Sequence, residues 1–258
     1  MLLAIDIGNS EVTLGVHVDS QWRARWRLRT VVNGTPDEYA LLLKGLFREE
    51  GIPLGGVRYV GLASVVPPVT DTLVHVVQRH LQADLLVVRP GVRTGLRIRA
   101  ENPAEVGADL IVNAVAAYER FKDACIIVSL GTATVFTAVS AGRDFLGAAI
   151  APGLRMAARA LSEQTAQLPD IQLSAPPVTI GRNTVHAMQS GLVWGYVSLV
   201  EGMVARFQEE MRTNARVIAT GGLAPLIAPL TSVVEVVDPW LTLEGLRILV
   251  ERNLRSSR

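Results

Sequence analysis

Short apolar runs separated by turn residues open the chain. Residues 2–7 form an apolar run, Gly8, Asn9 and Ser10 have turn chemistry, and residues 12–18 resume with β-branched side chains. Runs of this kind bounded by such residues are typical of two strands joined in a hairpin. We expect residues 22–29 to add a third strand.

After residue 35 the pattern changes, and helical and strand-like segments alternate. Apolar residues recur at helical spacing over residues 36–50, 69–81 and 108–121, and short apolar runs at 57–64 and 85–88 predict strands. Strands followed by alternating helix and strand predict a mixed sheet flanked by helices. The pattern therefore places the chain in the α/β class.

A similar pattern starts again after residue 124. Residues 4–10 and 127–133 each contain an apolar strand, one polar residue, a hydrophobic residue, glycine and a small polar turn. A repeat of this length indicates two similar domains rather than a solenoid. We place these domains at residues 1–119 and 120–258, with a ligand site in the cleft between them. Three further elements are expected in the second domain: a helix over 192–212, a strand over 216–219 and a helix over 243–254.

Composition excludes several classes of protein. The net charge is +1 without a basic block, so neither nucleic acid nor an anionic membrane is expected as a partner. The apolar N-terminus is interrupted by Asp6 and lacks a preceding positive region, and no apolar run reaches the ~20 residues of a membrane span. A cytoplasmic protein is therefore expected. The single cysteine, Cys125, lies in an apolar run and is expected to be buried and inert.

Two turns carry candidate phosphate-binding residues. Asp6 ends a strand beside Gly8, Asn9 and Ser10, so the turn can hold phosphate oxygens while the carboxylate orients a hydrated magnesium ion. The corresponding turn of the second half contains Thr132 after a glycine. Each turn alone is equally compatible with an ordinary hairpin. Together they indicate that two strand-turn-strand elements hold the phosphates of a nucleotide.

Two further features are candidates for chemistry. Asp109 falls in the first turn of the helix expected over residues 108–121, where a carboxylate either caps backbone N–H groups or accepts the proton of an attacking hydroxyl. Gly221 and Gly222 follow a strand and would permit close approach of a flat ring such as adenine, and a plain turn explains them as well. The four histidines are scattered and do not have the spacing of a zinc site.

Taken together, these motifs resemble one family, the type III pantothenate kinases of the actin-like ATPase and sugar-kinase superfamily. The matching segments run through nearly the whole chain and are residues 6–10, 64–67, 95–96, 102–103, 105–109, 131–134, 150–154, 165–169, 180–184, 189–191, 220–223 and 238–246. The resemblance implies two actin-like, ribonuclease H-like domains with mixed sheets. It implies ATP-dependent phosphorylation of pantothenate to 4'-phosphopantothenate, the first step of coenzyme A biosynthesis. It also implies magnesium, potassium or ammonium as cofactors, and a homodimer.

On the nucleotide side, the resemblance implies that Asp6 serves magnesium and the phosphates, that residues 8–10 line the phosphates and that Thr132 contacts ATP. Ser129 stands where the family usually has an aspartate that binds the monovalent cation. The internal repeat shows the same change, because Ser129 occupies the place that Asp6 has in the first half. A neutral hydroxyl is a poor substitute for this carboxylate.

On the substrate side, the resemblance implies that Gly107, Ala108 and Asp109 hold pantothenate, with Asp109 as the general base. Thr184 would reach the pantothenate bound to the other subunit. Leu110 replaces an arginine that usually follows the Gly-Ala-Asp triplet and helps to bind the substrate. A cation with five hydrogen-bond donors is lost at this position.

Three functions are consistent with this pattern. Retention of the carboxylates Asp6 and Asp109 favours an active pantothenate kinase. Neutral residues at Leu110 and Ser129, and Ala100 where an aromatic residue is usual, favour a non-catalytic paralogue with a binding or regulatory role. Because Ala100 and Leu110 would make the pocket larger and more apolar, a kinase of another small hydroxylated substrate is the third possibility.

Overall fold

A computed structural model describes residues 1–255, which form two compact units. Unit 1 comprises Met1–Gly95, Glu101–Ala116 and the chain from Thr242 onwards, and unit 2 comprises Leu96–Ala100 and Ala117–Leu241. Each unit is thus assembled from separate pieces of chain. The division into folding domains at residue 119 stays a prediction, because compactness does not test independent folding. Within residues 1–255, no helix is both long and apolar enough to cross a membrane.

The centre of unit 1 is a five-stranded mixed sheet with the strand order β3-β2-β1-β4-β5. Its strands are β1 (Leu2–Ile7), β2 (Glu11–Val18), β3 (Gln21–Arg29), β4 (Tyr59–Ser64) and β5 (Asp84–Val87). The strand β1 pairs antiparallel with β2 and parallel with β4, which makes it the middle strand of the sheet. The predicted hairpin and its third strand are therefore confirmed.

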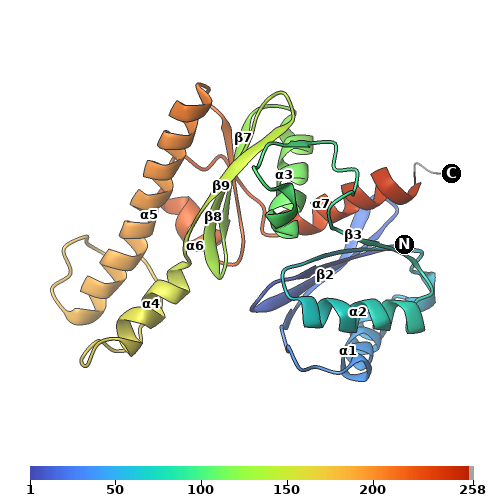
Figure 1. Cartoon of the computed structure of the whole chain (residues 1–258). Helices are drawn as coiled ribbons and strands as arrows, with labels where there is room; N and C mark the ends of the chain where they lie inside the picture. The colour runs from blue at the N-terminus through green and yellow to red at the C-terminus, as the bar shows by residue number, and fades with distance from the viewer. Residues whose placement is uncertain (256–258) are drawn as a thin grey trace. The chain divides into compact units, whose positions relative to one another are not determined.

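Helices cover both faces of this sheet (Figure 1). On one face lie α1 (Pro36–Glu49) and α2 (Pro67–His80), whose buried residues, including Phe47 and Leu73, join the core of the sheet. Thr35 and Glu38 form a capping box that fixes the start of α1. The opposite face receives α7 (Leu241–Val250), which is followed by the π-helical turn η4 (Glu251–Arg255). Short 3-10 turns occur at η1 (Leu54–Gly56) and η2 (Pro103–Glu105).

Unit 2 is built on a six-stranded mixed sheet with the order β11-β10-β7-β8-β9-β6. Its strands are β6 (Arg97–Ile98), β7 (Cys125–Leu130), β8 (Ala133–Val139), β9 (Asp144–Pro152), β10 (Arg216–Thr220) and β11 (Val236–Val237). The helical elements that follow these strands are α4 (Leu154–Glu163), α5 (Thr184–Met211), α6 (Ala224–Ile227) and η3 (Ala228–Leu230). Figure 1 shows α5 as a long helix beside this sheet, where it buries Val193, Val200 and Val204.

The two sheets repeat one topology. The order β3-β2-β1-β4-β5 in unit 1 corresponds to β9-β8-β7-β10-β11 in unit 2, with antiparallel and parallel pairs at the same places. Unit 2 adds only β6 at the free edge of β9. The internal repeat inferred from residues 4–10 and 127–133 thus corresponds to β1 and β7 with the turns that follow them.

The helix α3 (Ala108–Phe121) is held against α7 within unit 1. Thr242 donates a hydrogen bond of 2.8 Å from its hydroxyl to the side-chain oxygen of Asn113, which is buried. The two helices approach so closely that a Cβ on Gly245 would lie 2.1 Å from the carbonyl oxygen of Val112. The position of α3, which carries Asp109, therefore depends on its contact with α7.

This contact gives a first prediction. The Gly245→Ala variant is expected to be less stable than the wild type by about 2 kcal/mol, because the added methyl group forces two backbones apart. The matched control is Gly195→Ala in α5, where an added Cβ has no neighbour within 4 Å. That variant is expected to gain up to about 1 kcal/mol from its higher helix propensity. Urea denaturation of both proteins measures the difference, and a Gly245→Ala protein as stable as the wild type would contradict the close contact.

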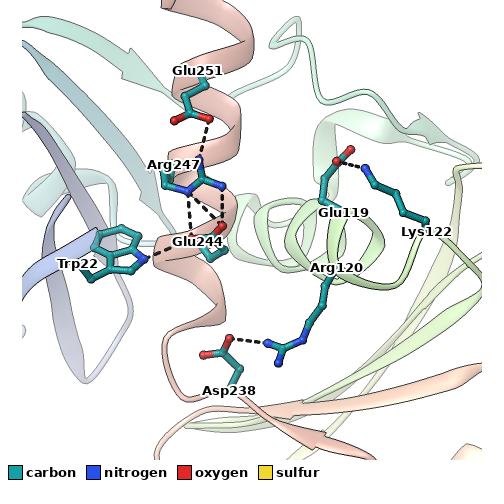
Figure 2. Close-up of polar contacts among 8 residues, drawn as sticks. All are labelled: Trp22, Glu119, Arg120, Lys122, Asp238, Glu244, Arg247 and Glu251. Atoms are coloured by element: carbon teal, nitrogen blue, oxygen red, sulfur yellow. Dashed lines mark hydrogen bonds and ion pairs between the residues drawn. The ribbon is translucent and has the colours of Figure 1, made fainter. Parts of the chain in front are cut away.

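Polar contacts fix α7 on its other side (Figure 2). Arg247 donates to Glu244 at 2.6 Å and to Glu251 at 2.7 Å, and the Trp22 indole N–H donates to Glu244 at 3.2 Å. In unit 2, Arg120 forms an ion pair of 3.1 Å with Asp238, and Glu119 pairs with Lys122 (Figure 2). These pairs are partly exposed, so each contributes little to stability, but the Trp22 contact ties α7 to the start of β3.

Candidate active site

The first candidate element is the turn after β1. Asp6 is partly buried near the end of this strand, opposite Thr13 on β2. Within the turn, the Gly8 N–H donates to the carbonyl of Glu11 at 2.9 Å. The hydroxyl of Thr30 donates to the carbonyl of Gly8 at 2.6 Å, and its N–H donates to the carbonyl of Ser10 at 3.0 Å. The turn is thus held in one conformation, with Ser10 and its neighbour Asn9 exposed.

The second element is the start of α3. The carbonyl of Gly107 accepts the first helical hydrogen bonds, from Leu110 at 3.1 Å and Ile111 at 3.2 Å. The carboxylate of Asp109 folds back toward Gly107, so that a Cβ on Gly107 would lie 2.6 Å from its Oδ1 atom. Glycine is therefore the residue that leaves room for this carboxylate. Ala108, Asp109 and Leu110 are all partly buried.

The charge of Asp109 acts on Asp6 within unit 1. Burial raises the pKa of Asp6 to about 7, and the negative charge of Asp109 adds to this effect. Burial also raises the pKa of Asp109, while hydrogen bonds from the backbone N–H groups of Leu110 and Asp109 oppose the rise. Asp109 thus has the helix-capping contacts of a structural carboxylate and lies close enough to Asp6 to repel its charge. A bound cation would offset the negative charge of such a pair.

A hydrated magnesium ion fits this pair. Magnesium is usually held by one or two carboxylates together with water and substrate phosphates, so Asp6 is a sufficient protein donor and Asp109 need not be a ligand. Among residues 1–255 no group of three or more histidine, cysteine, aspartate or glutamate side chains is placed to hold a metal. A closed protein cage of the kind that binds zinc is therefore not part of the described structure.

The corresponding turn of unit 2 lies between β7 and β8. Ser129 pairs with Val135 on β8 and with Thr220 on β10, so its neighbours in the sheet are uncharged. Gly221 follows Thr220 with a positive φ of 91°, and a Cβ on it would lie 2.6 Å from the carbonyl oxygen of Leu130. Gly221 therefore requires glycine both for its backbone angle and for this close approach. Ser129 and its two partners in the sheet carry no carboxylate, whereas a monovalent-cation site of the implied kind would use one.

The remaining candidate residues lie at exposed positions. Thr132 is exposed in the turn after β7, and Gly222 follows Gly221 in the loop before α6. Thr184 is exposed as the first residue of α5, whose preceding Asn183 accepts a hydrogen bond from His186 with its side chain.

Cys125 is confirmed as a buried residue, and burial raises the pKa of its thiol to about 12. A thiol of this kind is protonated at neutral pH and is a poor nucleophile. Its expected inertness is consistent with this position.

Two supporting residues were not found by sequence reasoning. Thr30 holds the turn after β1 through both its hydroxyl and its N–H. Gly153 lies against the turn after β7, because a Cβ on it would lie 2.1 Å from the carbonyl oxygen of Thr132. The signal for Gly153 was present, since it belongs to a segment that matches the family, whereas Thr30 stands at the end of β3 without any motif.

Comparison with known proteins identifies the family. A family model described as type III pantothenate kinase matches residues 2–206. The type III pantothenate kinases of Moorella thermoacetica and Anaeromyxobacter sp. strain K are each 48% identical over 253 residues, which covers 98% of this chain and 100% of each relative. A structure of MreB 5 of Spiroplasma citri bound to AMPPNP has a TM-score of 0.59 at 11% identity and covers 99% of this chain and 97% of that one. The two mixed sheets, their shared topology and these similarities confirm the predicted α/β fold of the actin-like type, and the chain belongs to the type III pantothenate kinase family.

Proposed function

We propose that this chain catalyses the ATP-dependent phosphorylation of pantothenate to 4'-phosphopantothenate. The observation that carries the proposal is the pair of partly buried carboxylates, Asp6 and Asp109, which lie close enough within unit 1 for their charges to interact. Phosphoryl transfer depends mainly on positioning and electrostatic stabilisation, and a carboxylate that accepts the substrate proton is a recurring part of it. Family membership at 48% identity supports the same reaction.

Asp109 is the proposed general base. Its raised pKa, caused by burial, brings it closer to the pH at which proton transfer is efficient. The hydroxyl oxygen of the substrate attacks the γ-phosphorus of ATP, the bond between this phosphorus and the oxygen of ADP breaks, and the hydroxyl proton passes to Asp109. Gly107 and Ala108 hold the substrate beside this carboxylate, and the two backbone N–H groups that contact Asp109 keep it oriented.

Each unit is proposed to contribute its own candidate nucleotide-binding residues. Residues 8–10 in unit 1 and Thr132 in unit 2 each offer donors to phosphate oxygens, and Gly221 and Gly222 permit a flat ring to approach the backbone. Asp6 would hold a hydrated magnesium ion, which neutralises charge on the transferring phosphoryl group when bound. Potassium or ammonium, which the family resemblance implies as a cofactor, would find a neutral hydroxyl and no carboxylate at Ser129.

The family resemblance further supports a cytoplasmic homodimer in which Thr184 contacts the substrate of the other subunit. The exposed position of Thr184 at the start of α5 is compatible with such a contact. Pantothenate is the proposed small-molecule partner, and neither nucleic acid nor a membrane is proposed.

A second candidate function is a non-catalytic paralogue with a binding or regulatory role. The observation that favours it is the set of neutral side chains at Leu110, Ser129 and Ala100, where the family usually has charged or aromatic residues. Loss of preorganised charge near a reacting phosphate typically costs on the order of 100-fold in rate for each contributor.

An ADP-release assay with pantothenate, ATP, magnesium and potassium separates the two candidates. The wild type is expected to release ADP in a pantothenate-dependent manner, and the double variant Leu110→Arg with Ser129→Asp is expected to be at least about 10-fold faster. If only the double variant is active, the wild type has the fold of the kinase but does not catalyse the reaction.

A further inference from the structure

Unit 1 contains a cavity of about 550 Å³ at the opposite end of β1 from Asp6. One wall of the cavity is a row of residues paired across the sheet, Tyr59 on β4, Leu2 on β1, His17 on β2 and Trp22 on β3. Asp6 follows Leu2 on the same strand at a distance of about 13 Å, from the usual rise per residue. The cavity is therefore separate from the candidate active site, and its volume is that of a small-molecule site.

The facing wall is one side of α7 and the turn η4 that follows it. Glu244, Arg247 and Glu251 recur at spacings of three and four residues, so they lie on one face of the helix, and all three line the cavity (Figure 2). Arg247 donates to both carboxylates, and the Trp22 indole N–H donates to Glu244, which joins the two walls. The cavity thus has rings on the side of the sheet and fixed charges on the side of the helix.

The rings of the sheet wall suit a flat, cationic group. Trp22 and His17 meet edge to face, with ring centroids 5.2 Å apart and an interplanar angle of 72°. The Arg25 guanidinium lies 5.5 Å from the centroid of the Trp22 ring, so the protein itself places a planar cation against this indole. Trp22 and Tyr59 are only partly buried, and both line the cavity. A flat ring in the cavity would find aromatic surface on this wall.

The charge of the lining is negative. Three acidic residues line the cavity, the two carboxylates of the helix wall and Asp19 in the turn between β2 and β3. Against them stand Arg247 and at most one positive charge from Met1, while His17 adds a charge only when it is protonated. Histidine is mostly neutral at pH 8, so at least one negative charge is in excess there. Because Arg247 is already bonded to two carboxylates, the lining favours a bound cation over a bound anion.

We propose that this cavity is a second ligand site, which takes a small organic monocation with a flat ring, such as a protonated aromatic amine or an aryl amidine. The ring lies along the aromatic row of the sheet, and the charged group faces the carboxylates of Glu244 and Glu251. The site is independent of the proposed function, because none of its residues belongs to the candidate active site.

Calorimetric titration of the full chain at pH 8 with matched probes tests the proposal. Benzamidine, benzamide and benzoate have the same ring and a planar substituent of the same size, and differ in charge. Benzamidine is expected to bind at least about 10-fold more tightly than benzamide, and benzoate more weakly than both. Guanidinium, which has the charge without the ring, is expected to bind at least about 10-fold more weakly than benzamidine. Equal affinity for all four probes, or no binding of benzamidine, would overturn the proposal.

Three variants locate the bound probe. Glu251→Gln keeps the shape of the side chain without its charge and is expected to weaken benzamidine binding about 10-fold. The matched control Glu49→Gln, at an exposed position of α1, and the active-site variant Asp6→Asn are expected to keep the wild-type affinity. Loss of binding in Asp6→Asn but not in Glu251→Gln would place the amidine at the candidate active site and overturn the assignment. If Glu251→Gln does not fold, the probe series and Asp6→Asn still decide.

Discussion

The Asp109→Asn variant is expected to lose about 1,000-fold in kcat, because the asparagine amide cannot accept the proton of the substrate hydroxyl. Asparagine has the shape of aspartate, and its side-chain oxygen can still accept hydrogen bonds from the backbone N–H groups of Asp109 and Leu110. The stability of the protein is therefore expected to change by less than about 1 kcal/mol. The measurement combines steady-state rates with urea denaturation and with ATP binding, which is expected to stay close to that of the wild type.

This variant separates the two interpretations of Asp109 that the sequence leaves open. If Asp109 only caps α3, the variant keeps a rate within about 10-fold of the wild type. The conservative variant Asp109→Glu supplies an additional comparison, because it keeps a carboxylate but moves it by one methylene group. Its rate is expected to fall between those of the wild type and Asp109→Asn.

The Asp6→Asn variant is expected to be more stable than the wild type in the absence of metal and to be inactive. The folded protein keeps Asp6 protonated up to a pKa of about 7, whereas the unfolded chain releases this proton near its ordinary value of 3.8. Between these two pH values the folded state binds more protons, so the free energy of unfolding of the wild type falls as the pH rises. At pH 8 the Asp6 carboxylate is ionised and lowers the free energy of unfolding by its full amount. Replacement by asparagine removes this destabilisation.

The expected gain at pH 8 is on the order of 2 kcal/mol, less than the whole shift would give, because Asp6 is only partly buried. At pH 4 the gain is expected to vanish. Urea denaturation at both pH values, with EDTA present, measures it, and Asp71→Asn on the exposed surface of α2 serves as the matched control. A variant that is equally destabilised at both pH values would show that Asp6 has no charge penalty in the folded state.

The activity of the Asp6→Asn variant provides the second half of this prediction. Without the carboxylate the site loses its proposed magnesium ligand, and the rate of phosphoryl transfer is expected to drop by at least about 100-fold. Stability and activity would then change in opposite directions, which is the behaviour of a residue retained for function at a cost to the fold.

Much of the fold could be predicted because its signals are local. The strands β1, β2 and β3 and the helices α1, α2 and α3 have the hydrophobic spacing of their class, and their predicted ranges agree with the structure within a few residues. The repeat of the turn after β1 in the turn after β7 was also visible, because both turns combine glycine with small polar residues.

Other elements gave no clear local signal. The helix α5 starts at Thr184, eight residues before the expected position. Asn183 caps this start with a side-chain hydrogen bond, and hydrophobic spacing does not reveal such a cap. The strand β9 and the helix α4 were not predicted. Residues of β9 alternate between partly buried and exposed positions, yet alanine and glycine give this alternation little contrast in hydrophobicity.

The last helix illustrates a different limit. The range 243–254 was expected as one helix, whereas α7 ends at Val250 and continues as a π-helical turn. That α7 belongs with β2 and β4 of unit 1 depends on the close approach of Leu243 to Gly15 and of Val250 to Gly61. Contacts between residues so distant in the chain follow from the tertiary fold and not from any pattern in one segment.

The site was predictable in its residues but not in its electrostatics. Asp6 and Asp109 could be named from their motifs, yet the effect of the Asp109 charge on Asp6 depends on tertiary structure that neither motif contains.

A single-turnover experiment tests the central claim, that the carboxylates of unit 1 support phosphoryl transfer to a pantothenate-type alcohol. Enzyme in excess is mixed with ATP labelled at the γ-phosphate, magnesium and pantothenate, and the products are separated. The label is expected to appear on the alcohol with the wild type and to remain on ATP with Asp109→Asn. Label that stays on ATP in the wild type, although ATP binds, would contradict the claim and favour the non-catalytic paralogue.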